Sequence, residues 1–371
     1  MIKRIFYLFA LLLLSTSVSI FAGNQHEPSI SAASAILYDP LSDTVLYGKN
    51  YEVCCGMAST TKIMTALVAL EQYDLQQQIS IQPEWCGIEG SSMYLKAGEE
   101  VTVSELLYGL LLASGNDAAT ALAGVDPDGS QAFVEKMNHY AMQLGLENTK
   151  FENPSGLDGE NHYTTALELA RLTAEALKNP CFREIVSTKE ITTAGRTLRN
   201  HNRLLWEADA CGVKTGYTKA CGRCLVSAKE QNGRMLICVT LNAPDDWADH
   251  KALYDYGFSQ YRPHNLLGAG DCGAVPLVSS SKTQVRLYCN ENYAIWLTDK
   301  ELAQVKIEIC GPRFCYGTIE AGTPYGRLEI HLENQQLFET DVYFAEYAAE
   351  LQPGKNSFWD WIKIKIRRRE P

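Results

Sequence analysis

The hydrophobic pattern of this 371-residue chain changes character near residue 264. Before that point, apolar residues at helical spacing alternate with short strand-like runs. After it, short alternating runs separated by turn residues dominate. Interleaved strands and helices are typical of an α/β (α+β) domain, and closely spaced short strands are typical of a small all-β sandwich. We therefore expect two folded domains, over residues 30–262 and 265–352.

The elements expected in the first region are two hairpins and five helices. Thr165 and Glu168 have the spacing of a capping box, which predicts a helix start at that point. The strands are expected over 35–38, 44–47, 224–228 and 235–241, and the helices over 59–73, 104–123, 130–145, 165–178 and 246–256. In the second region strands are expected over 284–288, 294–297, 305–309, 327–332 and 341–347.

The first 22 residues have the pattern of a secretory signal peptide. Lys3 and Arg4 precede an apolar stretch over 5–20, and Ala22 is a small residue suited to cleavage. An uncleaved membrane anchor is the alternative. Either reading predicts an exported protein that acts at the outer face of the cytoplasmic membrane or in the cell wall.

Residues 353–371 combine aromatic side chains with a basic cluster. On a helix, Phe358, Trp361 and Ile362 would share one side, and Arg367 to Arg369 would supply positive charge. Such a segment can lie on an anionic membrane surface but is too short to span a bilayer. A final β-strand with a basic end is the alternative, because residues 362–366 alternate in polarity.

The composition argues against several other functions. A net charge of −11 is unfavourable for nucleic-acid binding. Several of the twelve cysteines lie in apolar runs, where a free cysteine behaves as a small core residue. Cys221 and Cys224 form a lone CxxC pair, which cannot complete a tetrahedral zinc site, and residues 268–273 match GxGxxG without the flanking strand and helix. We expect no metal and no cofactor.

Three short motifs carry the candidate chemistry. They are Ser59-Thr-Thr-Lys62, Ser114-Gly-Asn116 and Lys214-Thr215-Gly216. Each is weak alone, but the three in this order correspond to the set found in class A β-lactamases and penicillin-binding proteins, in which the middle member is Ser-Asp-Asn.

Each motif residue has a role that its chemistry suits. Ser59 and Lys62 lie three positions apart at a helix start, so a lysine of lowered pKa could take the proton of the serine nucleophile. Ser114 could relay a proton to the leaving amine, and the N–H groups of Ser59 and Tyr217 could hold the oxyanion. The expected substrate-binding residues are Asn116 for an amide, Lys214 and Thr215 for a carboxylate, Gly216 for close backbone approach, and Tyr217.

The segments around these motifs resemble those of low-molecular-mass penicillin-binding proteins of the D-alanyl-D-alanine carboxypeptidase family. The similar stretches are residues 57–66, 90–99, 110–119 and 213–218, and the resemblance extends over about residues 30–262. It implies a transpeptidase/β-lactamase-like domain, with an antiparallel sheet flanked by helices, followed by the β domain and an amphipathic tail. It also implies a serine peptidase that removes the terminal D-alanine from peptidoglycan stem peptides through an acyl-enzyme on Ser59, with β-lactams as inhibitors.

Two alternatives and one departure accompany this reading. A β-lactamase would need a deacylating glutamate, and the sequence offers no convincing one between the second and third motifs. A catalytically weak penicillin-binding or wall-binding scaffold would not need all the motif residues. Some relatives place an arginine after the strand that follows Lys-Thr-Gly, whereas residues 241–247 contain none here. What holds the substrate carboxylate besides Lys214 and Thr215 is therefore left open.

Overall fold

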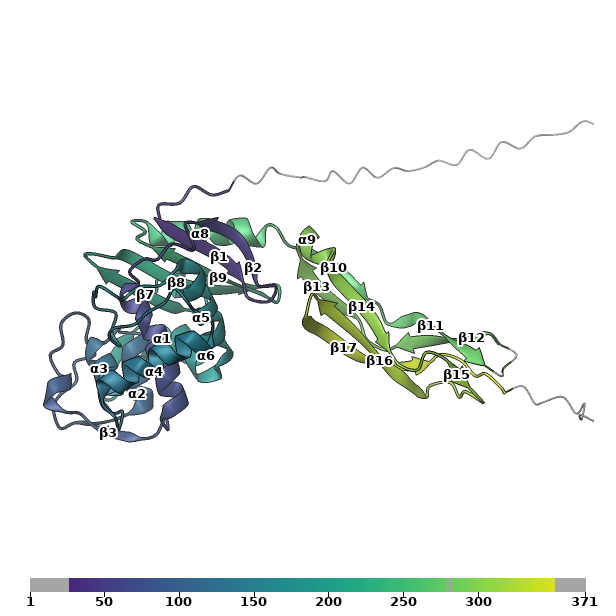
Figure 1. Cartoon of the computed structure of the whole chain (residues 1–371), viewed down its shortest axis with the longest axis horizontal. Helices are drawn as coiled ribbons and strands as arrows, with labels where there is room; N and C mark the ends of the chain where they lie inside the picture. Colours follow the sequence, from purple (N-terminus) through teal and green to yellow (C-terminus); the bar gives the residue numbers. More distant parts are fainter. Residues whose placement is uncertain (1–26, 279, 281, 351–371) are drawn as a thin grey trace, which may run out of the picture.

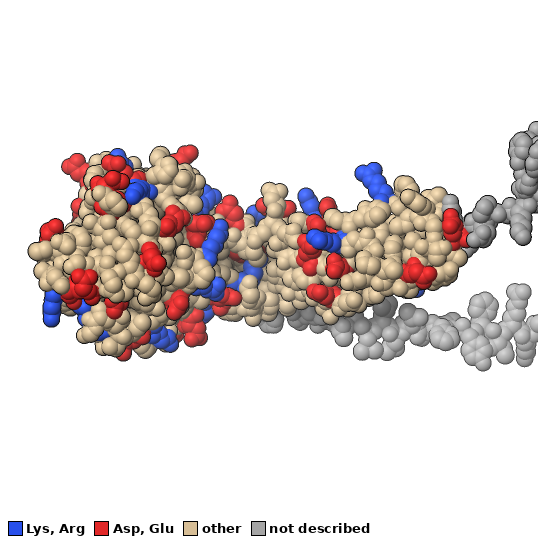
Figure 2. Space-filling model, turned by 90° about the horizontal axis from the view of Figure 1, so that it is seen from below, with Lys and Arg blue, Asp and Glu red and all other residues tan. Residues whose placement is uncertain are grey.

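The chain folds into two units that lie end to end (Figure 1). The computed structural model describes residues 27–278, 280 and 282–350, so the predicted signal segment and basic tail lie outside the described residues. Figure 2 shows the same two units from below, with acidic and basic side chains interspersed over both. None of the helices in the described ranges has the length and apolar character needed to cross a bilayer.

A five-stranded antiparallel sheet forms the centre of the first unit. Its strand order is β2-β1-β9-β8-β7, so the first strand of the unit pairs with the last. Because side chains alternate along a strand, Ile237 and Val239 of β9 face one hydrophobic cluster, and Leu236 and Cys238 face another. Both faces are covered, which explains the continuous apolar runs. The strands are β1 Ser34–Asp39, β2 Thr44–Lys49, β7 Val213–Thr218, β8 Gly222–Gln231 and β9 Arg234–Leu241.

Helices cover the two faces of this sheet unequally. The helices α8 (Asp246–Phe258) and α7 (Leu204–Glu207) pack on one face, and the other helices form a lobe on the opposite face. Two short hairpins lie at the edge of the lobe: β3 Gln78–Ser80 with β4 Glu100–Thr102, and β5 Glu190–Thr193 with β6 Arg196–Arg199. The lobe contains η1 Ala58–Thr61, α1 Lys62–Gln72, η2 Pro83–Trp85, α2 Val103–Leu111, α3 Asn116–Gly124, α4 Ser130–Gln143, α5 Ala166–Lys178 and α6 Pro180–Ser187.

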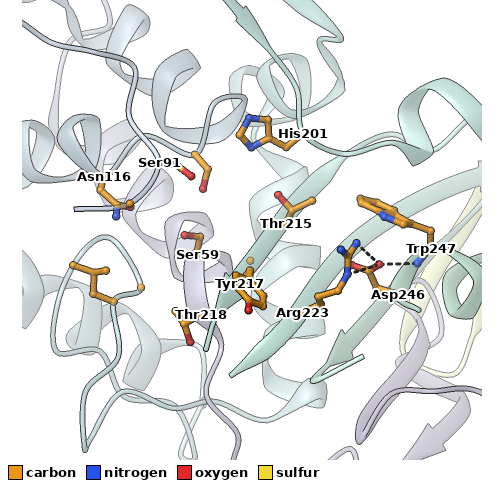
Figure 3. Close-up of a pocket in the computed structure, with 15 residues that line it drawn as sticks. Ser59, Ser91, Asn116, His201, Thr215, Tyr217, Thr218, Arg223, Asp246 and Trp247 are labelled. Atoms are coloured by element: carbon orange, nitrogen blue, oxygen red, sulfur yellow. Dashed lines mark hydrogen bonds and ion pairs between the residues drawn. The ribbon is translucent and has the colours of Figure 1, made fainter. Parts of the chain in front are cut away.

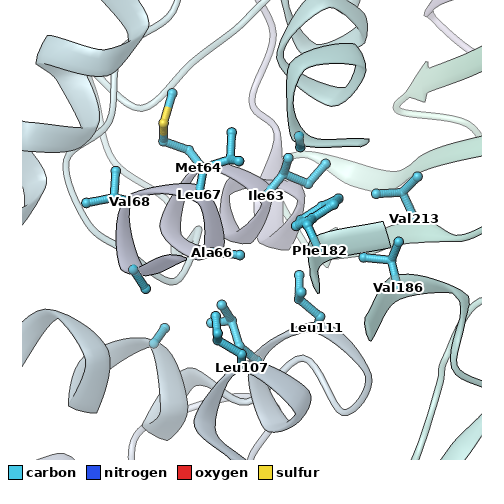
Figure 4. Packing of buried hydrophobic residues seen from close by; sticks show 14 of the residues in the cluster. Ile63, Met64, Ala66, Leu67, Val68, Leu107, Leu111, Phe182, Val186 and Val213 are labelled. Carbon is cyan, nitrogen blue, oxygen red and sulfur yellow. The ribbon is translucent and has the colours of Figure 1, made fainter. Parts of the chain in front are cut away.

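The helix α1 runs through the middle of the lobe. Eight of its eleven residues are buried, including Ile63, Ala66 and Leu67. Figure 4 shows them packed among side chains of α2, α6 and β7, such as Leu107 and Phe182. A helix buried on most of its surface is held rigidly, and this fixes the position of whatever precedes its first turn.

Two helix predictions differ from the structure in detail. The stretch 104–123 forms two helices, α2 and α3, separated by a break at residues 112–115. Thr165 does cap α5, because its side chain accepts a hydrogen bond from the backbone N–H of Glu168. The carboxylate of Glu168, however, accepts from Asn148 and Thr149, so the reciprocal half of the predicted capping box is replaced by a tertiary contact.

The second unit consists almost entirely of strands, as predicted for the region after residue 264. Its six-stranded sheet has the order β14-β16-β17-β12-β11-β15, and β10 and β13 form a separate pair. Val285, Leu287, Ile330 and Val342 lie in its hydrophobic core. The elements are β10 Arg262–Leu267, β11 Gly270–Val278, β12 Gln284–Cys289, β13 Tyr293–Leu297, α9 Asp299–Leu302, β14 Val305–Cys310, β15 Cys315–Tyr316, β16 Pro324–Leu332 and β17 Gln335–Phe344.

A buried charge cluster joins the two units. Arg234, at the start of β9, forms ion pairs with Asp39 of β1 and with Glu301 of α9 in the second unit, the latter at 2.5 Å. The guanidinium also lies over the ring of Tyr261, whose hydroxyl donates to Asp39. All three charged side chains are at most 4% exposed, so this contact couples the first unit to the β unit in a water-excluded position.

Candidate active site

Ser59 lies in the single 3-10 turn that precedes α1. The neighbouring Ala58 has a φ of 48°, in the left-handed region that residues with a β-carbon seldom adopt. Its carbonyl is packed against Gly156, where an added β-carbon would lie 2.0 Å from Ala58 O. The loop that contains Gly156 therefore packs directly against the segment that carries Ser59, and only a glycine at position 156 leaves room for this contact.

The side chain of Lys62 is fully buried directly behind Ser59. Its Nζ lies 2.9 Å from Ser59 Oγ, 2.7 Å from Asn116 Oδ1 and 2.6 Å from the carbonyl oxygen of Ser155. Burial holds the pKa of Lys62 well below its ordinary value, the positive charge of Lys214 lowers it further, and Asp117 opposes the shift. Burial is dominant because it disfavours the charged ammonium.

The three neighbours of Lys62 fix how a neutral amine would be oriented. A neutral amine has two N–H donors and one lone pair. Ser155 O can only accept, and Asn116 Oδ1 can only accept because Nδ2 of the same amide donates to Glu89 O at 2.5 Å. The lone pair must then face Ser59 Oγ, which is the arrangement that a general base requires.

The second predicted motif occupies the break between α2 and α3. Ser114 is 4% exposed, has a φ of 59° and lines the cavity in front of Ser59. Asn116 begins α3 and holds Lys62 on one side and the Glu89 loop on the other. The buried Asp117 fixes the adjoining rim, because it accepts from the backbone N–H groups of Met93 and Leu95.

The third motif lies on β7, which passes close to Ser59. A β-carbon placed on Gly216 would lie 3.0 Å from Ser59 N and 3.1 Å from Met57 O, so the strand can approach this closely only without a side chain. Thr215, Gly216 and Tyr217 all line the cavity. Lys214 is buried behind them: it is 1% exposed and its Nζ donates to Thr215 O at 2.9 Å. Burial lowers the pKa of Lys214 to about 7.

These residues surround a cavity of about 530 Å³ (Figure 3). Of the eight predicted site residues, Ser59, Ser114, Asn116, Thr215, Gly216 and Tyr217 line it, while Lys62 and Lys214 lie buried behind its wall. Among the described residues there is no group of three or more His, Cys, Asp and Glu side chains placed to hold a metal ion. All twelve cysteines, which fall within the described ranges, are free.

Sequence reasoning missed several residues of the cavity wall. Gly156 and Leu157 come from a loop that carries no recognisable motif. His201, Arg223, Asp246 and Trp247 line the end of the cavity beyond Thr215. The sequence contained one signal for Arg223. If the chain turns over residues 219–221 to form a hairpin, Arg223 becomes the cross-strand partner of Tyr217, and the structure has this pairing.

A comparison of the whole sequence with known families agrees with this geometry. A family model described as D-alanyl-D-alanine carboxypeptidase matches residues 22–245. The chain belongs to this family of serine peptidases. Within the family, it is 32% identical to D-alanyl-D-alanine carboxypeptidase DacF of Bacillus subtilis, over 96% of this chain and 98% of that protein.

Solved structures of the family share the fold. Penicillin-binding protein 5 of Haemophilus influenzae superposes with a TM-score of 0.63 at 28% identity, covering 87% of this chain and 99% of that one. The DD-transpeptidase of Streptomyces K15 superposes with a TM-score of 0.61 at 34% identity, covering 63% of this chain and 99% of the other. The expected transpeptidase/β-lactamase-like fold with a following β domain is thus confirmed.

Proposed function

We propose that this protein is a serine-type D-Ala-D-Ala carboxypeptidase that removes the terminal D-alanine from peptidoglycan stem peptides. The observation that carries the proposal is the position of Lys62, whose three contacts leave only Ser59 Oγ for the lone pair of a neutral amine. This is the activated serine of acyl-transfer enzymes. The family to which the chain belongs supplies the substrate class.

The reaction follows from the roles of the site residues. Lys62 takes the proton of Ser59, whose Oγ bonds to the penultimate carbonyl carbon, and the N–H groups of Ser59 and Tyr217 hold the resulting oxyanion. The C–N bond then breaks as Ser114 gives its hydroxyl proton to the leaving amine and takes in its place the proton that Lys62 had accepted, so D-alanine departs and Lys62 is neutral again. Water attacks the Ser59 ester and loses a proton to the neutral Lys62, and that proton passes to Ser59 Oγ as the shortened peptide is released. Asn116 supports these steps by holding the amine of Lys62 in place. Lys214 supports them by lowering the pKa of Lys62.

The location and domain limits belong to the same proposal. A catalytic domain over 30–262 would be exported by residues 1–22 and would act on the extracytoplasmic side. The β domain over 265–352 would connect it to the basic aromatic tail at 353–371, which would rest on the anionic membrane. The architecture of the described residues, with the two units end to end, is compatible with that arrangement.

Two assays on the full chain test the activity. Intact-protein mass spectrometry after incubation with benzylpenicillin should detect a penicilloyl adduct on the wild type and none on Ser59→Ala. The wild type should also release D-alanine from a peptide ending in D-Ala-D-Ala, and Ser59→Ala should not. Circular dichroism would verify that the variant is folded.

The same assays separate the competing functions. An adduct without D-alanine release would favour the scaffold reading, and rapid turnover of the penicillin would favour a β-lactamase. Transfer of the acyl group to an added amino acid in preference to water would favour a transpeptidase, the activity named for the Streptomyces K15 structure. No adduct on a folded wild type would contradict the proposal altogether.

A further inference from the structure

The far end of the active-site cavity holds a cation that no motif predicts. Arg223 is the only lysine or arginine among the described residues that line this cavity. Lys214 does not reach the cavity, because its ammonium is buried and bonded to the backbone of Thr215. Burial, assisted by the nearby charge of Lys214, lowers the pKa of His201, so that imidazole is neutral near pH 7. Arg223 is therefore the positive charge available to a bound anion.

The sheet register directs Arg223 toward the same face as the third motif. Thr215 and Tyr217 are two residues apart on β7, so their side chains share a face of the sheet. Arg223 of β8 is the direct antiparallel partner of Tyr217 and therefore lies on that face too. In Figure 3, Thr215 lies between Ser59 and Arg223. A substrate attacked at Ser59 would extend its leaving group past Thr215 toward the guanidinium.

The guanidinium is held in a fixed orientation by α8. Its Nε and one terminal nitrogen donate to the same oxygen of Asp246, at 3.1 Å and 2.7 Å. The carboxylate of Asp246 is 4% exposed and also accepts the backbone N–H of Trp247, whose ring centroid is 5.7 Å from the Arg223 carbon Cζ. Arginine has five N–H donors, so this anchoring uses only part of its capacity. The Arg223 side chain is 43% exposed, which leaves it accessible from the cavity.

We propose that Arg223, together with the hydroxyl of Thr215, binds the C-terminal carboxylate of the D-alanine that leaves, and that Asp246 is its positioning residue. The inference rests on the proposed carboxypeptidase function and answers the question left by the arginine-free segment 241–247. A planar guanidinium can bind a carboxylate through two parallel hydrogen bonds. Asp246 offsets part of the positive charge of Arg223. The preference for a free carboxyl terminus must therefore come from the fixed orientation of the guanidinium hydrogen-bond donors and not from net charge.

A matched pair of small substrates isolates this contact. One is a D-alanyl thioester of thioglycolic acid, whose leaving group carries a carboxylate, and the other is the methyl ester of that compound. Both acylate a serine and release a thiol that is measured by colour. In Arg223→Gln, the ratio of kcat/KM for the acid to that for the methyl ester should fall about 10- to 100-fold, the value expected for a charged hydrogen-bonding pair. The methyl ester should be turned over at nearly the wild-type rate.

Arg203→Gln is the matched control. Arg203 also lies over the Trp247 ring, at 5.8 Å, but pairs with Glu207 and is not among the cavity-lining residues. Its variant should keep the wild-type ratio. Asp246→Asn should lower the ratio less than Arg223→Gln, since the cation remains without its anchor.

Two results would overturn the assignment. The ratio could stay at the wild-type value in folded Arg223→Gln, which would leave the carboxylate to another group. Alternatively, kcat/KM could fall equally for both substrates, which would mean that Arg223 maintains the structure of the site and does not bind the carboxylate. Failure of the wild type to release D-alanine from any peptide would instead refute the proposed function, and it is recognised before any variant is compared.

Discussion

Gly216 approaches Ser59 so closely that a β-carbon on the glycine would lie 3.0 Å from the serine nitrogen. The gap between β7 and η1 is the place where the two proposed oxyanion donors meet, so its width decides whether both reach one oxygen. We expect Gly216→Ala to force the strand and the turn apart and to slow acylation by penicillin about 10- to 100-fold, by misplacing one donor. The rate of adduct formation measures this. Gly268→Ala is the control, because an added β-carbon there meets no atom within 4 Å.

The pH dependence of acylation should report the coupling of Lys62 to Lys214. Only the neutral amine of Lys62 can accept a proton, so the rate should fall as pH drops through the pKa of Lys62. Lys214 lowers that pKa, and replacing it by methionine should raise the pKa and move the acidic limb of the profile to higher pH. Acylation by a chromogenic cephalosporin, followed across pH, gives the limb directly. The exposed Lys219 lies on the same hairpin, and Lys219→Gln should leave the limb in place; an unmoved limb in Lys214→Met would contradict the coupling.

Removing only the cation from the charge cluster between the two units should strongly lower the free energy of unfolding. Arg234→Met leaves two carboxylates buried without their cation, and we expect a loss of about 3–5 kcal/mol in the free energy of unfolding. Urea denaturation measures it. Arg171→Met removes an exposed ion pair to Asp43, whose side chains are 45% and 66% exposed, and should cost less than about 1 kcal/mol. Equal losses of unfolding free energy in the two variants would mean that the buried cluster stabilises the protein no more than an exposed ion pair does.

His162 should make the folded state sensitive to mild acid. Its Nδ1 accepts the backbone N–H of Glu152, and its Nε2 lies 2.7 Å from Thr61 Oγ1, whose own proton is directed to Ala58 O. The ring is thus bound as the neutral Nε2–H tautomer, and burial lowers its pKa to about 4.

The sign of the effect follows from the direction of that shift. The unfolded chain binds a proton near pH 6.5 and the folded chain only near pH 4, so stability is complete above about pH 6.5 and declines as pH falls through this window. The full contribution is about 3 kcal/mol. Denaturation at pH 7 and pH 5 should show a smaller difference in His162→Gln than in the wild type, although the buried His250 keeps part of it. His139→Gln, on an exposed helix face, should behave as the wild type; an undiminished difference in His162→Gln would refute the assignment.

Local sequence signals predicted the parts of the site that lie within one element. The spacing of Ser59 and Lys62 indicated a shared contact, and the structure places the two side chains 2.9 Å apart. The helical pattern over 104–123, in contrast, did not show the break at residues 112–115 that holds Ser114. The family resemblance then supplied the fold class, which the solved relatives confirm.

Contacts between distant elements could not be predicted in this way. Glu168 matched a local capping box, yet a tertiary contact with Asn148 and Thr149 took its carboxylate. The contact of the Lys214 ammonium with the carbonyl oxygen of Thr215 likewise had no signal in the sequence. Arg223 was overlooked because its neighbourhood depends on the register of β7 and β8 and on the docking of α8. Hydrophobic periodicity sets which face is buried, but it does not specify which polar groups meet across elements.

The cluster around Arg234 also has a consequence for the order in which the protein is made. Asp39 has been synthesised when Arg234 emerges, but Glu301 follows 67 positions later. A growing chain that ends before α9 therefore holds a guanidinium with half of its counter-charge, in a site that excludes water. The catalytic unit reaches its final electrostatic state only after the β unit has docked, so the β unit contributes to the maturation of the enzyme as well as to its length.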